Sequence, residues 1–203
     1  MKTYIILALL VCSAFTLPEL QNVEAELPTE LQVETTESAL QYYYDFLKGV
    51  FLDKSSLMAP PLYKQCNSKW GSKKMGSKTV CQVGCLMSSM SMALAGLGKK
   101  ISGQTVNPGN FNDWLRSHHG YSGNLYVWGA AESTFKVKYQ GQKQGGTHTI
   151  DSKHITILNV RNGGHWVLAT SKSGNTYKVL DPGYQKSSYT TSEVVRAAKY
   201  QIL

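Results

Sequence analysis

Residues 85–97 are apolar on nearly every face of a helix, and this restricts how the rest of the chain can pack. The hydrophobic side chains of this stretch leave no broad polar stripe, and they are Leu86, Met87, Met90, Met92, Ala93, Leu94 and Leu97. A helix with this pattern is normally buried, and the glycines at positions 96 and 98 are expected to end it. We therefore expect a buried helix with the other elements packed around it.

The last third of the chain alternates apolar and polar residues in short runs separated by turn signals. Strands are expected at residues 135–139, 155–161, 166–171 and 177–180. Asn162-Gly163-Gly164 and Ser173-Gly174-Asn175 are typical of turns between neighbouring strands. Elsewhere the patterns indicate a short strand at 62–66, a loop at 67–80, and helices at 111–117, 125–132 and 192–199. Helices followed by an antiparallel sheet predict the α+β class.

The first residues have the anatomy of a secretory signal peptide. One lysine precedes an apolar run at residues 4–17, and Pro18 follows it. We expect residues 1–17 to be a signal peptide, with cleavage near Ala14 to Leu17 or further along near Ala25. The protein would then be secreted, or lumenal in the secretory or lysosomal pathway. A buried N-terminal helix is the alternative. The run is shorter than the ~20 apolar residues that span a bilayer, so stable membrane insertion is not expected.

Charge divides the remaining chain sharply. Residues 18–58 carry eight acids and two bases, whereas residues 59–203 carry five acids and eighteen bases. Opposite charges in adjacent segments favour an acidic propeptide at 18–58 that acts in cis on a basic domain at 59–203. A helical pattern at 38–52 suits either such a propeptide or an extra helix of the mature domain, and Met58-Ala59-Pro60-Pro61 is typical of a boundary.

The chain has four cysteines, at positions 12, 66, 81 and 85. Cys12 would leave with the signal peptide, so an odd number remains in an oxidising compartment. One disulfide and one free thiol is the simplest partition. Because Cys85 is the candidate for a catalytic thiol, we expect Cys66 to pair with Cys81. Three buried free thiols, or an intermolecular disulfide, are the alternatives.

Cys85 and His165 are the candidate nucleophile and general base. Cys85 follows a glycine and opens the buried helix, where unpaired backbone N–H groups and the helix dipole favour an anion such as a thiolate. His165 follows the Gly163-Gly164 turn at the start of a predicted strand, which would hold it rigidly and leave it accessible. Histidine titrates near neutrality, as a general base must. A buried structural cysteine and a structural histidine are the alternatives.

Asp181 and Gln65 are the candidates that would assist this pair. Asp181 ends the strand expected to lie beside the His165 strand, about 5 Å away, so its carboxylate could orient the imidazole. The Asp-Pro-Gly sequence is also a strong turn signal by itself. Gln65 could donate to an oxyanion together with the backbone N–H of Cys85; Gln82 is the competing choice, and a surface glutamine is the alternative.

The order of these residues resembles that of papain-like cysteine peptidases, and more closely the C-39-like cysteine peptidase family, relatives of the bacteriocin-processing peptidases. The similarity covers residues 62–200 and rests on these motifs: Tyr63-Lys64-Gln65, Trp70-Gly71, Gly84-Cys85 with Ser88-Ser89 and Met92, Gly164-His165-Trp166-Val167, and Asp181-Pro182-Gly183. It implies Cys85 as nucleophile, His165 as base, Asp181 as orienting residue and Gln65 as oxyanion donor. Two departures are Leu86, where family members often have glycine, and the long segment between Gln65 and Cys85.

The resemblance implies a papain-like α+β fold and a secreted cysteine peptidase that hydrolyses peptide bonds through a thioester. Its substrates would be peptides, proteins or cell-wall peptides. Two alternatives stay open, a peptidoglycan-cleaving amidase or endopeptidase and a catalytically inactive secreted binding module. The cysteine and histidine spacings do not fit a zinc site, and neither a phosphate-binding loop nor an aromatic-basic motif indicates nucleic acid. We therefore expect no metal, no cofactor and no nucleic-acid partner.

Overall fold

The computed structural model describes residues 59–203 together with Gln41. The predicted signal peptide at 1–17, the acidic segment at 18–58 and the helix expected at 38–52 therefore lie outside the described residues, Gln41 apart. Within residues 59–203, no helix has both the length and the apolar character needed to cross a membrane.

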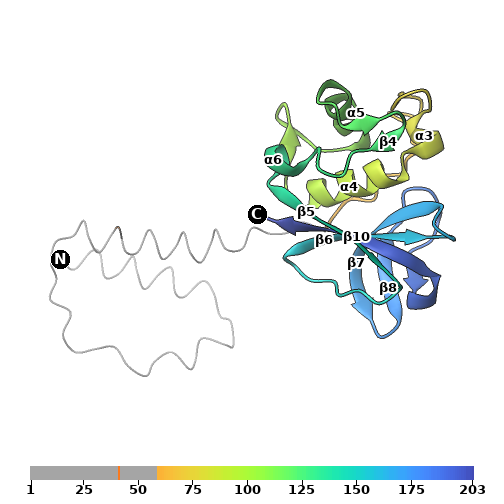
Figure 1. Ribbon diagram of the computed structural model, residues 1–203. Coiled ribbons are helices and arrows are strands. Elements are labelled where there is room, and N and C mark those ends of the chain that lie inside the picture. Colours follow the sequence, from red (N-terminus) through yellow and green to blue (C-terminus); the bar gives the residue numbers. More distant parts are fainter. Residues whose placement is uncertain (1–40, 42–58) are drawn as a thin grey trace, which may run out of the picture. The chain divides into compact units, whose positions relative to one another are not determined.

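The described domain combines helices, which come mostly first, with an antiparallel sheet (Figure 1). Its helices are α3 (Val80–Val83), α4 (Cys85–Gly96), α5 (Pro108–Ser117), α6 (Glu132–Phe135) and the 3₁₀ helix η2 (Thr191–Glu193). Two short hairpins join β1 (Lys100–Ile101) to β2 (Gln104–Thr105) and β3 (Tyr121–Ser122) to β4 (Leu125–Tyr126). The strands of the main sheet are β5 (Val137–Gln144), β6 (His154–Val160), β7 (His165–Ser173), β8 (Thr176–Leu180), β9 (Ser188–Thr190) and β10 (Val194–Ile202).

The main sheet has six strands in the order β5-β10-β6-β7-β8-β9, and every neighbouring pair is antiparallel. The last strand, β10, inserts between β5 and β6, while β6 to β9 follow one another as a meander. The predicted α+β class is thus confirmed at the level of mixed helices and an antiparallel sheet. The turns predicted at 162–164 and 173–175 are those that join β6 to β7 and β7 to β8.

Helix α4 lies between the sheet and the other helices, as its apolar sequence predicted (Figure 1). Every residue from Met87 to Gly96 is buried. One core cluster joins α4 and α5 to the sheet residues Ile157, Leu168 and Tyr200. A second cluster lies on the other face of the sheet and contains Leu158, Val160, Val167, Ala169, Tyr177, Val179, Tyr189, Val194 and Ala197. The sheet is therefore covered by apolar side chains on both faces.

The helix predicted at 192–199 is wrong, because this segment forms η2 and then β10. β10 has register shifts against both neighbours, after Val194 on the β6 side and after Ala198 on the β5 side. Such bulges place an extra residue in one strand and interrupt the two-residue alternation of inward side chains. The buried positions Val194, Ala197, Ala198 and Tyr200 consequently mimic a helical spacing.

Two other predicted elements are wrong. Residues 125–132 do not form one helix: Gly123, at φ +61°, turns a two-residue loop that pairs β3 with β4, and the helix begins only at Glu132. Residues 62–66 do not form a strand. This segment is held by separate contacts, in which Gln65 N donates to Pro182 O (2.9 Å) and Trp70 Nε1 donates to Lys64 O (2.8 Å).

Candidate functional site

The side chains of His165 and Asp181 form a buried hydrogen-bonded pair. His165 Nε2 donates to Asp181 Oδ1 over 2.7 Å. The two residues are only 5% and 1% exposed, so water hardly competes for this bond. His165 is the first residue of β7, and Asp181 directly follows β8. The two strands are antiparallel, and Leu180 at the end of β8 pairs with Leu168 near the beginning of β7. Asp181, the next residue, therefore lies at the same end of the sheet as His165.

Cys85 and His165 line the same cleft. Cys85 is the first residue of α4, it is half-buried, and it is the free cysteine of the described residues. It lies close enough to His165 for its side chain to raise the pKa of the imidazole. Asp181 occupies Nε2, which leaves Nδ1 as the ring nitrogen available to a thiol. The structure therefore brings Cys85, His165 and Asp181 into one site.

The electrostatics of His165 favour its charged form. Burial alone would lower the pKa of His165, but the hydrogen bonds with Asp181 and Cys85, and the charges on both, raise that pKa to about 9. An imidazole with this environment is an imidazolium at neutral pH. It can stabilise a neighbouring thiolate and can later release a proton to a leaving group.

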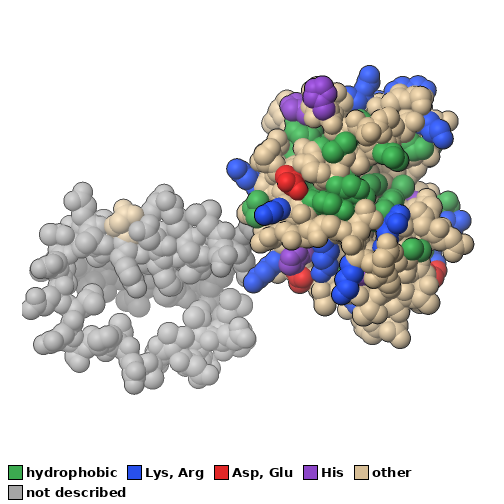
Figure 2. Space-filling model, viewed as in Figure 1, with side chains coloured by type: hydrophobic (Ala, Val, Ile, Leu, Met, Phe, Trp, Pro, Cys, Tyr) green, Lys and Arg blue, Asp and Glu red, His purple; other side chains and the backbone are tan. Residues whose placement is uncertain are grey.

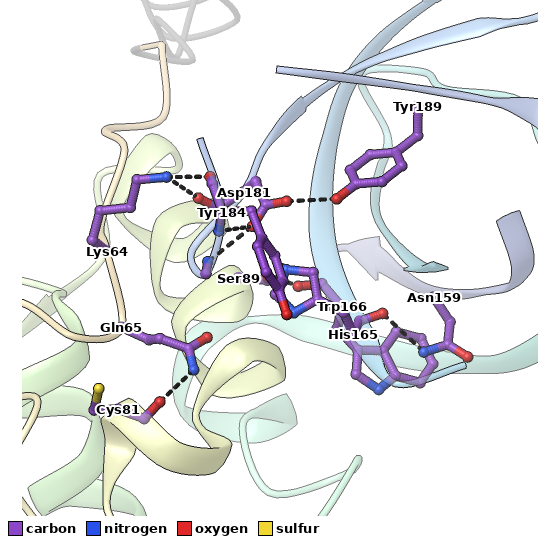
Figure 3. Close-up of polar contacts among 11 residues, drawn as sticks. Lys64, Gln65, Cys81, Ser89, Asn159, His165, Trp166, Asp181, Tyr184 and Tyr189 are labelled. Carbon is purple, nitrogen blue, oxygen red and sulfur yellow. Dashed lines mark hydrogen bonds and ion pairs between the residues drawn. The ribbon is translucent and has the colours of Figure 1, made fainter. Parts of the chain in front are cut away.

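Asp181 is fixed by four donors. Besides His165 Nε2, its Oδ1 accepts from Gly183 N (2.8 Å) and Tyr184 N (2.8 Å), and its Oδ2 accepts from the Tyr189 hydroxyl (2.8 Å) (Figure 3). Burial alone would raise the pKa of Asp181, but these hydrogen bonds, led by that from His165, lower it below its ordinary value. The carboxylate is therefore held ionised, with both oxygens oriented.

Contacts between α4 and β7 bring the cysteine to the histidine. Ser89, one turn after Cys85, donates its hydroxyl to Trp166 O over 3.2 Å (Figure 3). From the neighbouring strand β6, Asn159 Nδ2 donates to His165 O (2.9 Å) on β7 and to Gly163 O (3.0 Å) in the turn before it. A side chain of β6 thus holds the backbone of His165, and a side chain of α4 holds the backbone of the next residue, Trp166.

The beginning of α4 has backbone donors available for an anion. Gly84 is the N-cap and supplies no side-chain hydrogen bond to the first turn, where N–H groups have no partner within the helix. A Cβ at Gly84 would lie only 2.4 Å from Val80 O, so the tight step from α3 into α4 requires glycine. The backbone N–H of Cys85 therefore lies at an uncapped helix N-terminus, next to its own sulfur.

Gln65 is placed beside this site by a disulfide and a hydrogen bond. Cys66 and Cys81 form the disulfide that was predicted, and Gln65 Nε2 donates to Cys81 O over 2.7 Å (Figure 3). This bond uses one of the two amide hydrogens and leaves the other for a second acceptor. The competing candidate, Gln82, lines the same cleft, but its Oε1 caps α3 by accepting from Thr79 N (2.9 Å).

Lys64 attaches the Gln65 segment to the turn after Asp181. Its ammonium group donates to Asp181 O (2.7 Å) and to Tyr184 O (2.5 Å) (Figure 3). Together with the bond from Gln65 N to Pro182 O, this contact joins two segments more than a hundred residues apart in the sequence. Gln65 and Asp181 therefore belong to one connected site.

Cys85 and His165 lie at the side of a cleft of about 490 Å³. The described residues that line the cleft carry no Asp, Glu, Lys or Arg. Apolar side chains form much of its wall, among them Met75, Leu86, Met87, Leu125 and Tyr126. Leu125 is 74% exposed, which leaves a large apolar surface for a bound molecule. The cleft therefore suits an uncharged, partly apolar chain next to the thiol.

Sequence reasoning missed Tyr184 and Tyr189. Tyr184 packs edge-on against the His165 ring at 4.9 Å between centroids, and the Arg161 guanidinium lies 4.1 Å from the Tyr184 ring centroid. Its position directly after Asp-Pro-Gly was an available signal. Tyr189 reaches Asp181 only because β9 pairs with β8, and a three-residue strand leaves too little pattern to predict that pairing.

No group of three or more His, Cys, Asp or Glu side chains within the described part of the chain could hold a metal ion. In comparisons with known proteins, no family model, no curated protein and no solved structure shows a significant match to this chain.

Proposed function

We propose that this chain is a cysteine peptidase of papain-like fold, related to the C-39-like family, with Cys85 as nucleophile. The observation that carries the proposal is the position of His165, which donates to a buried carboxylate through Nε2 and lines the same cleft as the free thiol of Cys85, whose side chain raises the pKa of the imidazole. A nucleophile, a base and a group that orients the base constitute the arrangement needed for acyl transfer.

In the proposed reaction the Cys85 thiolate attacks the carbonyl carbon of a peptide bond and a C–S bond forms. The His165 imidazolium gives its proton to the leaving amine as the C–N bond breaks, and a thioester remains. Neutral His165 then takes a proton from water, whose oxygen attacks the thioester and releases the acid and the thiol. Asp181 keeps the imidazole oriented throughout.

Two donors are available for the oxyanion that forms in each half of the reaction. The backbone N–H of Cys85 lies at the uncapped N-terminus of α4, and the second amide hydrogen of Gln65 is not used by Cys81. Fixed donors of this kind stabilise the charge that develops in the transition state. A cleft whose described lining residues include no Asp, Glu, Lys or Arg suits a peptide chain better than a polyanion.

Alkylation of the thiol tests the proposal directly. Cys85 is the free cysteine in residues 59–203, so iodoacetamide labelling followed by peptide mass spectrometry reports on one sulfur. We expect rapid labelling at neutral pH in the wild type and labelling at least about tenfold slower in His165→Ala. A Cys85 that is inert in both proteins would instead support an inactive binding module.

Hydrolysis identifies the bond that is cut. The purified chain, before and after removal of residues 1–58, is incubated with casein and with purified peptidoglycan, with Cys85→Ser as the inactive control. The proposal expects casein peptides that are absent with Cys85→Ser. Release of soluble cell-wall fragments without casein cleavage would instead support the amidase alternative.

A further inference from the structure

A second pocket, of about 400 Å³, lies away from the Cys85 cleft and shares none of its lining residues. Its wall comes from β5, from the segment Thr147 to Thr149, from Lys172 on β7 and from Ala197 and Lys199 on β10. Ala197 belongs to the second core cluster, so the pocket lies on the sheet face remote from α4. It plays no part in the reaction proposed above.

Three lysines from three different strands surround this pocket, namely Lys143, Lys172 and Lys199, and no acidic side chain lines it. None of the three forms an ion pair with a carboxylate of the described residues. Lys199 Nζ donates to Thr149 Oγ1 (3.0 Å), and Lys172 Nζ lies 5.1 Å from the Tyr177 ring centroid. Both partners are neutral, so these contacts leave the ammonium charges uncompensated.

His148 lines the pocket together with the three lysines and is 5% exposed. Burial lowers the pKa of His148, the Gly145 carbonyl opposes that effect, and the charges of Lys143, Lys199 and Lys172 each lower the pKa further. All three lysines therefore lie close enough to His148 to lower its pKa. The pKa of Asp151 is lowered first by its bond to His154 Nδ1 (2.7 Å) and less by the charge of Lys199, so the partner of this carboxylate is His154.

The Tyr177 hydroxyl holds the pocket wall at residues 146–148 in place without any ligand. This hydroxyl accepts from His148 N (2.7 Å) and lies within hydrogen-bond distance of Gly146 O (2.8 Å) and His148 O (3.1 Å). His148 Nε2 also bonds to Gly145 O at 2.6 Å. A segment tied to β8 in this way loses little conformational entropy when a ligand binds.

We propose that this pocket binds a phosphate- or sulfate-type oxyanion through Lys143, Lys172 and Lys199. Three ammonium groups around one pocket match a multiply charged oxyanion better than a single carboxylate. Thr147 and Thr149 also line the pocket. Residues 59–203 carry eighteen bases and five acids, and Figure 2 shows basic side chains spread over the visible face, so a long-range positive field would guide an anion to the pocket.

Isothermal titration calorimetry of the full chain tests the site and distinguishes the source of the oxyanion. Inorganic phosphate and sulfate form one arm, and a heparin-derived tetrasaccharide at the same ionic strength forms the other. Binding in the first arm alone indicates a free ion, whereas binding mainly in the second indicates an oxyanion carried by a polymer. Lack of binding in both arms would overturn the proposal.

The decisive comparison is between two double variants with equal loss of charge. Lys172→Gln with Lys199→Gln should weaken binding at least about tenfold and should reduce its dependence on salt. Lys100→Gln with Lys136→Gln alters exposed lysines outside the pocket and should change affinity less than about twofold. An equal loss of affinity in both double variants would mean that binding depends on net charge alone, and this would overturn the proposed site.

Folding and activity are measured on the same samples. The single variant Lys143→Gln alters an exposed side chain and should weaken binding by a smaller factor while the unfolding midpoint is unchanged. Labelling of Cys85 by iodoacetamide should be equal in all variants. The oxyanion-site proposal and the hydrolase proposal are therefore tested by separate measurements, and either can be wrong without the other.

Discussion

The hydroxyl of Tyr189 donates a hydrogen bond to Oδ2 of Asp181 over 2.8 Å, on the side of the carboxylate opposite the His165 bond. Both residues are almost fully buried, at 2% and 1% exposed. A donor to an ionised group in such a place is stronger than one between neutral groups. Tyr189 thereby extends the chain of contacts that begins at Cys85, although it touches neither the thiol nor the imidazole in the described interactions.

Replacing Tyr189 with Phe should therefore weaken the orientation of Asp181 without removing it. We expect kcat to fall about tenfold, which corresponds to the loss of one hydrogen bond to a charged group, while KM changes little. The pKa of Asp181 should rise, so the acidic limb of the pH–rate profile should move to higher pH. Tyr200→Phe is the matched control, since it removes a buried hydroxyl that donates to Trp128 O (2.9 Å). Equal effects of both variants on kcat would show a merely structural role for Tyr189.

Asp181→Asn should shift the basic limb of the same profile. The raised pKa of His165, about 9, depends on Asp181 and on Cys85, and burial, which lowers that pKa, would remain after the substitution. The imidazolium would then deprotonate at lower pH, and the basic limb of kcat/KM should move down from about pH 9. We also expect kcat/KM to fall about 100-fold at its optimum. Asp151→Asn, which breaks the exposed pair with His154, should leave the profile unchanged.

The fold and the site differ in how far the sequence could predict them. The helix at 85–97 and the turns after β6 and β7 depend on local patterns, so they were predictable. The strand β10 was mistaken for a helix because its bulges are imposed by pairing with β5 and β6, which no local pattern records. Local propensity cannot report strand partners that lie more than thirty residues away.

The same distinction applies within the site. Cys85, His165 and Asp181 each stand at the end of an element, next to a glycine or proline, and such positions can be recognised from sequence. Tyr189 contributes through a hydrogen bond that exists only after β8 and β9 have paired. Lys64 likewise acts across the fold, on carbonyl oxygens that carry no sequence signature.

Gly183→Ala should impair the site through contact with the imidazole alone. A Cβ at position 183 would lie 2.8 Å from His165 Cε1, closer than side chains tolerate. The imidazole or the backbone at 183 must then shift, and we expect kcat to fall at least about tenfold because misplaced catalytic groups cost rate steeply. At Gly129 an added Cβ would meet nothing closer than 3.9 Å, so Gly129→Ala is the control. Unchanged kinetics in Gly183→Ala would mean that the imidazole tolerates displacement.

Removal of the Cys66–Cys81 disulfide should affect both stability and rate. The disulfide links residues 15 apart in sequence, and a loop of this length is worth about 3 kcal/mol on the chain-entropy model. Cys66→Ala with Cys81→Ala should therefore lower the unfolding midpoint in calorimetry. It should also lower kcat, because the carbonyl of Cys81 holds Gln65 Nε2 at 2.7 Å. Gln65→Ala separates the two effects, since it deletes the donor but keeps the disulfide and should reduce kcat with a smaller change in midpoint. If the double variant loses stability but keeps its full kcat, the disulfide stabilises the domain without positioning Gln65, and the oxyanion would then depend on the N-terminus of α4.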